Sequence, residues 1–164
     1  MNPTQGGWII LLSLIFAMVL GVAHLPQTWP DWLSLVRPNW LVVVLFFWVV
    51  ELPHRVGLIG TWLLGLLVDV LLADPLGLNG LILAGVTYVT WRFYERLRMY
   101  SALQQSVVVF VLAAIAELIR GMVINMGSER GMGWELFTIP LMSMLAWPLV
   151  YLTLLRLRVG MRIE

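Results

Sequence analysis

Apolar residues fill most of the chain in six long runs, and charged residues are confined to short segments between them. Long uninterrupted apolar runs predict helices that are buried or lie in a membrane, because no polar face alternates along them. We expect helices near residues 8–25, 38–52, 56–72, 76–91, 103–126 and 136–155. The second is the shortest, since the 13 residues between Arg37 and Glu51 cover about 20 Å at 1.5 Å per residue.

A lipid bilayer accounts for these runs. A hydrocarbon core of roughly 30 Å needs about 20 helical residues to cross it. The 164-residue chain is 61% hydrophobic and 12% charged, with a mean hydropathy of +0.93, which is too apolar for a water-soluble domain of this size. We therefore predict an all-α integral membrane protein, in which residues 1–164 form a single domain, a compact bundle of six transmembrane helices. The first run is interpreted as a retained helix, because no Lys or Arg precedes it as in a signal peptide.

The arginines predict the orientation of this bundle. All ten basic residues are Arg, and short cytoplasmic loops carry the excess of positive charge in membrane proteins. With the N-terminus inside, the cytoplasmic segments hold Arg55, Arg92, Arg96, Arg98, Arg156, Arg158 and Arg162. The other side holds only Arg37 and Arg130. We therefore expect both termini in the cytoplasm, with loops too short for a soluble catalytic domain.

The third run contains a ladder of small and polar residues at every fourth position, namely Gly57, Thr61, Gly65 and Asp69. This spacing places them on one helix face, where small side chains let another backbone approach closely. The ladder is interpreted either as packing within the chain or as a docking face for a partner helix.

Three ionisable residues, Asp69, Glu117 and Arg120, are predicted to lie inside the membrane in its outer half. Glu117 and Arg120 are three positions apart on one helix face, which predicts an ion pair. An isolated charge at this depth costs at least ~2.5–3.5 kcal/mol, so each group is expected to have a partner. The three residues form a candidate polar cluster, which either fixes helix packing or binds a partner or ligand.

The link between the third and fourth helices is dense in turn formers. Pro75 ends one helix, Gly77 or Gly80 permits a sharp reversal, and Asn79 is a candidate cap for the next helix. An interrupted helix beside an intramembrane acid also marks substrate sites in some transporters. A substrate site near this link is therefore kept as an alternative to a plain turn.

The sequence offers no visible catalytic machinery. It has no cysteine, and it lacks the HExxH, GxSxG and phosphate-loop motifs. His24 and His54 lie at opposite ends of the predicted bundle and cannot share a metal. The net charge of +1, without a clustered basic face, argues against a nucleic-acid surface. We predict no enzymatic activity, cofactor or metal, and a cytoplasmic face that includes His54, Arg55, Arg92, Arg96 and Arg98.

Three segments, in this order, resemble the MreD family of rod-shape-determining proteins: Arg37-Pro38-Asn39-Trp40, Leu52-Pro53-His54-Arg55-Val56, and Asp69 with the following Pro75-Leu76-Gly77. The resemblance implies a non-enzymatic inner-membrane subunit of the cell-elongation machinery, which supports side-wall peptidoglycan synthesis. Such proteins are thought to bind MreC and, through it, to work beside MreB, RodA and the partner transpeptidase of RodA. The family is also similar in fold to the substrate-binding subunits of energy-coupling-factor transporters, although a shared fold does not transfer function.

The resemblance suggests where the partners would bind. The small face at Gly57, Thr61 and Gly65, or an outer groove facing lipid, would hold the transmembrane segment of MreC. The membrane-proximal part of MreC would meet outer groups near Arg37, Asn39, Asp74 and Asn79. The inner Arg92, Arg96 and Arg98 would face anionic lipid or MreB. The alternative is a small-molecule or lipid-precursor-binding subunit of transporter type, in which a cavity open to the outer leaflet is lined by Asp69, Asn79, Glu117 and Arg120.

Overall fold

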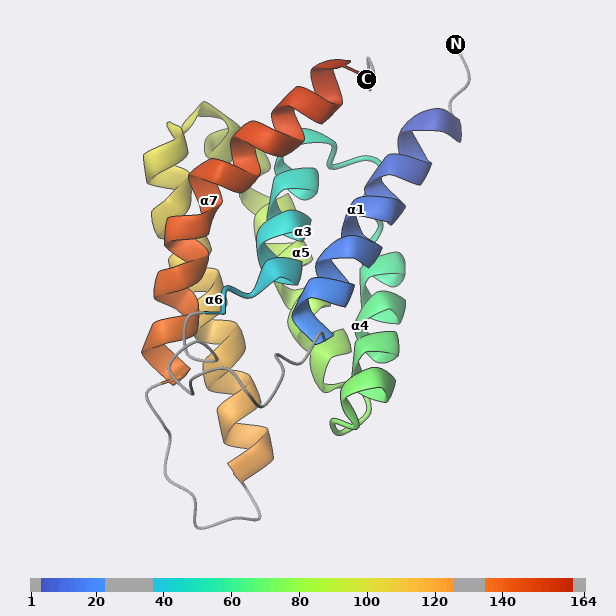
Figure 1. Cartoon of the computed structure of the whole chain (residues 1–164), viewed down its shortest axis with the longest axis vertical. Helices are drawn as coiled ribbons and strands as arrows, with labels where there is room; N and C mark the ends of the chain where they lie inside the picture. The colour runs from blue at the N-terminus through green and yellow to red at the C-terminus, as the bar shows by residue number, and fades with distance from the viewer. Residues whose placement is uncertain (1–3, 23–36, 126–134, 161–164) are drawn as a thin grey trace, which may run out of the picture.

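The computed structural model describes residues 4–22, 37–125 and 135–160, and these residues form an all-helical bundle (Figure 1). Its helices are α1 (Thr4–Val22), α3 (Trp40–Glu51), α4 (Leu58–Leu72), α5 (Leu78–Met99), α6 (Ala102–Asn125) and α7 (Glu135–Gly160). Each of the six predicted apolar runs corresponds to one of them. The predicted end of the first run, at residues 23–25, lies outside the described residues.

Two helices run beyond their predicted ends. Helix α5 continues from Trp91 to Met99, and α7 continues to Gly160 instead of ending near Leu155. The added segments contain arginines and other good helix formers and no proline, so nothing local ends the helix where the apolar run ends. Hydropathy marked the end of the apolar segment, which is not the end of the helix.

Length and apolar composition qualify two of the described helices to cross a membrane, Ala102–Ile124 and Leu136–Gly160. Gly7–Val22, Trp40–Glu51 and Leu58–Leu72 are apolar but shorter. Large apolar side chains point outward around the bundle, including Trp8, Ile59, Val70, Leu103 and Leu149, all at least 65% exposed. Such an apolar exterior suits contact with lipid. Six complete spans stay a prediction.

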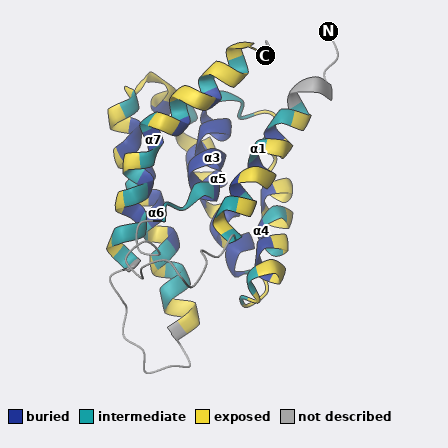
Figure 2. Cartoon of the chain, in the orientation of Figure 1, coloured by how far each residue is buried: buried dark blue, intermediate teal, exposed yellow. Residues whose placement is uncertain are grey.

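The centre of the bundle is the short helix α3, which contacts α1, α5, α6 and α7. Every residue from Leu41 to Val50 is buried, and α3 is the dark core in Figure 2. Because α3 is apolar on all sides, all of its faces are buried against other helices. Its 12 residues therefore need not match the thickness of a bilayer, since protein surrounds them.

The start of α1 and the end of α7 lie at one end of the bundle, which we call the terminal end, and the link from α4 to α5 lies at the opposite, distal end (Figure 1). At the terminal end Arg158 of α7 pairs with Glu51, the last residue of α3. The two side chains are only 21% and 9% exposed. This ion pair, which the sequence did not predict, joins the central helix to the last one.

Candidate functional site

The link between α4 and α5 is built around the buried carboxylate of Asp69, which is 0% exposed. One carboxylate oxygen accepts a hydrogen bond from the Gly77 backbone N–H at 2.8 Å. The other accepts from the Asn79 backbone N–H at 2.8 Å and from Asn79 Nδ2 at 2.7 Å. The first N–H groups of a helix have no intrahelical acceptor, so Asp69 caps α5 from the preceding helix.

The prediction that Asn79 caps this helix is wrong, because the N-cap position is Gly77 and Asp69 supplies the acceptor. Gly77 has a φ of 95°, in the left-handed region that glycine adopts without strain. This conformation produces the sharp reversal that the Pro75-Leu76-Gly77 segment predicted. The side chain of Asn79 instead forms hydrogen bonds with other side chains.

Asn79 connects three charged side chains. Its Nδ2 donates to Asp69 and, at 3.0 Å, to Asp74 Oδ2. Its Oδ1 accepts a hydrogen bond from Arg120 on α6. The structure therefore brings Asp69 and Arg120 together through Asn79, and it joins α4, α5 and α6 by a chain of hydrogen bonds.

A second set of polar contacts surrounds Asn39 at the start of α3. Asn39 Nδ2 donates to Glu117 Oε1 at 3.1 Å, and its Oδ1 accepts from the Val42 backbone N–H at 3.3 Å, which caps α3. The Asn39 backbone N–H donates to Ser143 Oγ at 2.8 Å. The buried Ser143 was not singled out from the sequence, because a lone serine in an apolar helix carries no distinctive pattern.

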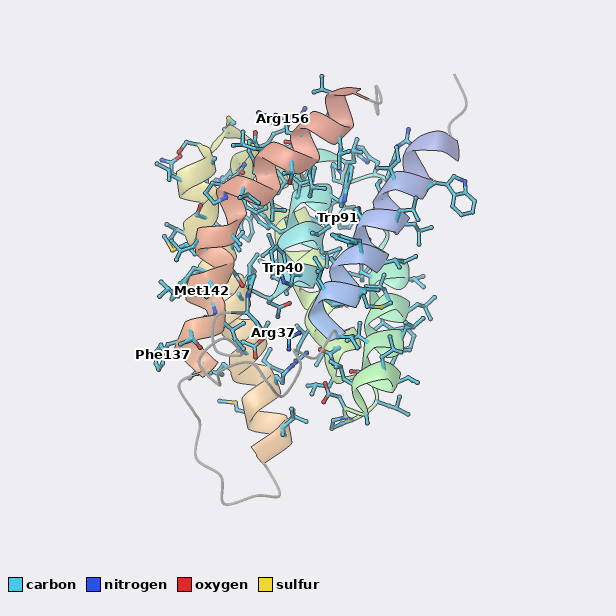
Figure 3. The ribbon with its side chains drawn as sticks, viewed as in Figure 1. Arg37, Trp40, Trp91, Phe137, Met142 and Arg156 are labelled. Atoms are coloured by element: carbon cyan, nitrogen blue, oxygen red, sulfur yellow. The ribbon has the colours of Figure 1, made fainter. Side chains whose placement is uncertain are left out.

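Arg37 lies beside the distal end of α1, as Figure 3 shows. Its Nη2 donates to the backbone oxygens of Leu20 and Gly21 at 3.4 and 3.3 Å. Glu117 and Arg120 each contact an asparagine of another helix. The predicted ion pair between Glu117 and Arg120 stays a prediction.

These polar groups surround a partly open cavity of about 310 Å³ near the distal end, which we call the distal cavity. All six described helices contribute to its wall. Its polar lining consists of Arg37, Asn39, Asn79, Glu117 and Arg120. Its apolar lining includes Met18, Val22, Leu41, Val42, Val68, Leu72, Ile82, Leu83 and Ile139. Asp69 and Asp74 do not line it, but both accept hydrogen bonds from Asn79, which does.

The small-residue ladder of α4 is mostly used within the chain. A Cβ added to Gly65 would lie 2.4 Å from the Cα of Gly80, so the backbones of α4 and α5 touch at this point. Thr61, Gly65 and Asp69 are buried, whereas Gly57 is exposed. The expectation that Gly65 offers a close-approach surface to a partner helix is therefore wrong, and the packing interpretation holds for these three residues.

The described segments that carry the predicted cytoplasmic residues, namely the link from α3 to α4 and the ends of α5 and α7, lie at the terminal end (Figure 1), and Arg162 lies outside the described residues. His54 and Arg55 are exposed in the link from α3 to α4. Arg92, Arg96 and Arg98 are exposed on the final turns of α5, and the Arg92 guanidinium lies 5.9 Å from the centre of the Phe93 ring. Among the described residues no group of His, Cys, Asp and Glu side chains is placed to hold a metal. His24 lies outside the described residues.

The helices, their exposed apolar surfaces and the partly polar cavity define an all-helical, membrane-associated protein. The family described as rod shape-determining protein MreD matches residues 3–157. The rod shape-determining protein MreD of Haemophilus influenzae is 32% identical over 152 residues, which cover 92% of this chain and 91% of that protein. The chain belongs to the MreD family of rod shape-determining proteins. No solved structure matches it, and the expected similarity to energy-coupling-factor subunits stays a prediction.

Proposed function

We propose that this chain is a non-enzymatic scaffold of the bacterial cell-elongation machinery that spans the inner membrane six times and binds MreC. The distal cavity receives the membrane-proximal part of MreC on the periplasmic side. MreB, RodA and the transpeptidase associate with the chain indirectly, through MreC, during side-wall peptidoglycan synthesis.

The observation that carries this proposal is the composition of the distal cavity. A polypeptide leaving the membrane brings both apolar side chains and polar backbone groups, and the cavity offers apolar walls beside charged and amide groups. Two of the lining residues, Arg37 and Asn39, belong to the segment on which the resemblance to the family rests. Each of these two residues is fixed by hydrogen bonds to another helix, so the cavity has a defined shape before a partner arrives.

A substitution that fills the cavity tests the proposal. Met18 of α1 lines the cavity, whereas the neighbouring Val19 is 54% exposed on the outside of the same helix. Met18→Trp is expected to lower the amount of MreC that copurifies with the tagged chain at least tenfold, because the larger ring occupies space that MreC needs. Val19→Trp adds the same ring outside the cavity and is expected to retain MreC at the wild-type level.

Both variants must first show wild-type insertion and thermal unfolding within a few degrees of the parent. A folded Met18→Trp variant that retains MreC would reject the cavity as the binding site. Failure to recover MreC with the wild-type chain, even after crosslinking in cells, would reject the scaffold function itself.

The proposed topology has a separate test. The link from α3 to α4, the last turns of α5 and Arg156 of α7 lie at the terminal end (Figures 1 and 3). These segments are rich in arginine, which favours a cytoplasmic position for that end and a periplasmic one for the cavity. The chain has no cysteine, so single cysteines can report accessibility without background. A membrane-impermeant maleimide should label Leu76→Cys in intact cells and Met99→Cys only after permeabilisation. The reverse labelling pattern would show that the orientation in the membrane is opposite to the proposed one.

A second candidate function is the binding of a small anionic molecule or lipid-linked wall precursor, as in transporter subunits. The observation that favours it is the pair of arginines in the lining of the cavity. Native mass spectrometry of the purified protein should then detect a bound ligand that Met18→Trp excludes. A ligand-free wild-type spectrum would leave the MreC scaffold as the remaining function.

A further inference from the structure

A partly open cavity lies between the end of α5 and the start of α6, at the terminal end of the bundle (Figure 1). It has a volume of about 210 Å³, and we call it the α5–α6 groove. Helix α5 packs mainly on α3 and α4, and α6 packs mainly on α7, so these two consecutive helices leave a space between them. The apolar walls of the groove are formed by Val89, Phe93 and Leu97 of α5 and by Val108 and Leu112 of α6.

Thr90 also lines the groove, and its hydroxyl has no partner within the described part of the chain. The residue is 0% exposed. A threonine in a helix can satisfy its hydroxyl on a carbonyl of the preceding turn, as Thr87 does by donating to the Leu83 oxygen at 2.8 Å. Thr90 does not. A buried polar group without a partner is unfavourable, and a ligand that supplies a hydrogen-bonding group would remove this cost.

Arg96 lines the groove on the final turns of α5, and its side chain is exposed. Among the described residues, no acidic side chain pairs with it. Arg92 and Arg98 add positive charge to the same turns, whereas Glu95 is the one acid there and accepts a hydrogen bond from the Tyr94 hydroxyl at 3.2 Å. The end of α5 therefore carries a net positive charge beside an apolar groove, which complements an anion that bears an apolar chain.

We infer that the α5–α6 groove binds an anionic phospholipid. The lipid phosphate accepts charge-assisted hydrogen bonds from Arg96. One ester carbonyl of the lipid accepts from the Thr90 hydroxyl, and the acyl chain attached to it lies against the apolar walls. Binding requires neither MreC nor the distal cavity, so the inference goes beyond the proposed scaffold and rests on it only for the choice of leaflet.

The positions of the polar groups along α5 fit such a lipid. Thr90 precedes Arg96 by six residues, which is about 9 Å along a helix, and an arginine side chain that leans back toward the N-terminus shortens this separation. Tyr100, which also lines the groove, is 44% exposed, and tyrosine is common at the level of the lipid headgroups. The proposed orientation places this end of α5 in the cytoplasmic leaflet, where anionic lipids give the membrane surface its negative potential.

Native mass spectrometry of the purified full chain in detergent measures the binding of added phosphatidylglycerol. One phosphatidylglycerol should bind at least tenfold more tightly than phosphatidylcholine, whose headgroup has no net charge. Arg96→Gln should weaken the binding of phosphatidylglycerol about tenfold, since hydrogen bonds to charged groups are worth that factor or more. The matched control is Arg98→Gln, which removes a charge from the same turns but outside the lining and should weaken binding by less than about threefold.

Thr90→Val separates a ligand contact from a structural one, because it keeps the shape of the side chain and removes the hydroxyl. It should weaken the binding of phosphatidylglycerol about threefold, the effect of one neutral hydrogen bond, and leave the Tm of the lipid-free protein unchanged or raised. The control Thr87→Val loses the hydrogen bond to Leu83 and should lower the Tm without changing lipid binding. A lower Tm with wild-type lipid binding in Thr90→Val would show that the hydroxyl is structural.

Equal affinity for the two lipids would overturn the inference, as would wild-type binding of phosphatidylglycerol by folded Arg96→Gln or Thr90→Val. A loss of copurifying MreB in Arg96→Gln, with lipid binding unchanged, would assign the arginine to a protein contact and also overturn it. Failure to recover MreC with the wild-type chain would reject the proposed function but leave the lipid measurements unaffected, so the two failures can be distinguished.

Discussion

The cap that Asp69 provides should be among the most important interactions for the stability of the fold. Replacing Asp69 by Ala removes the acceptor of three hydrogen bonds of 2.7–2.8 Å from a site with no exposure. Each buried donor left unsatisfied costs about 1–3 kcal/mol, so the total is roughly 3–9 kcal/mol. Whole domains are stable by only about 5–15 kcal/mol, and Asp69→Ala is therefore expected to yield little folded protein.

Asp69→Asn is the better variant for measurement, because it keeps the shape of the side chain and one acceptor oxygen. That oxygen can still accept the hydrogen bonds of Asn79. The new amide nitrogen then lies opposite the Gly77 N–H, and since both groups are donors, this hydrogen bond is lost. We expect a loss of about 2–3 kcal/mol from this contact and from the missing charge. For a chain of this length that corresponds to a fall in Tm of roughly 4–12 °C.

The nine tryptophans allow thermal unfolding in detergent to be followed by intrinsic fluorescence. Asp74→Asn is the matched control, since Asp74 accepts one hydrogen bond, from Asn79 at 3.0 Å, and is only partly buried. Its Tm should fall by no more than about 4 °C, the value for one ordinary hydrogen bond. If Asp69→Asn unfolds at the wild-type temperature, the carboxylate does not stabilise the link and the assigned capping role is refuted.

Two other sets of substitutions test the contact between α4 and α5 and the ion pair between α3 and α7. Gly65→Leu should abolish the yield of folded protein in detergent, because a Cβ at this position would lie 2.4 Å from the Cα of Gly80. A Cβ at Gly60 would meet no atom within 4 Å, so Gly60→Leu should be recovered normally. Equal yields of the two variants would refute the close contact between α4 and α5. Glu51→Gln and Arg158→Gln should each lower stability by about 1–3 kcal/mol, since each leaves a partly buried charge without its partner. The double variant should lose less stability than the sum of the two single losses. If its fall in Tm equals the sum of the two single falls, Glu51 and Arg158 are not coupled.

The helices could be predicted from the sequence because most ends of the apolar runs lie next to arginine, proline or glycine. The burial of α3 could not, since a run such as Leu41–Val50 has the same appearance whether lipid or protein surrounds it. The length of the run pointed to an unusual helix, but only the tertiary contacts show that it is the core.

The candidate site was predicted in part. Asp69, Asn79 and Arg120 were placed near one another, but the cap on α5 was assigned to the wrong side chain. A carboxylate that accepts N–H groups eight and ten residues later leaves no periodic signal in the sequence. The contact of Asn39 with Glu117 spans 78 residues, and no local pattern can indicate a pair so far apart.

The pairing of Glu51 with Arg158 has a consequence for the order in which the protein is made. The two residues are 107 positions apart, so the ribosome synthesises the acid at the end of α3 long before the arginine on α7 exists. Until α7 is inserted, α3 lacks one of the helices that pack against it, and the Glu51 carboxylate at its end lacks Arg158. We therefore expect the central helix to reach its final position last, although it is the second of the six described helices to be translated. A chain truncated before α7 is expected to be removed by membrane proteases.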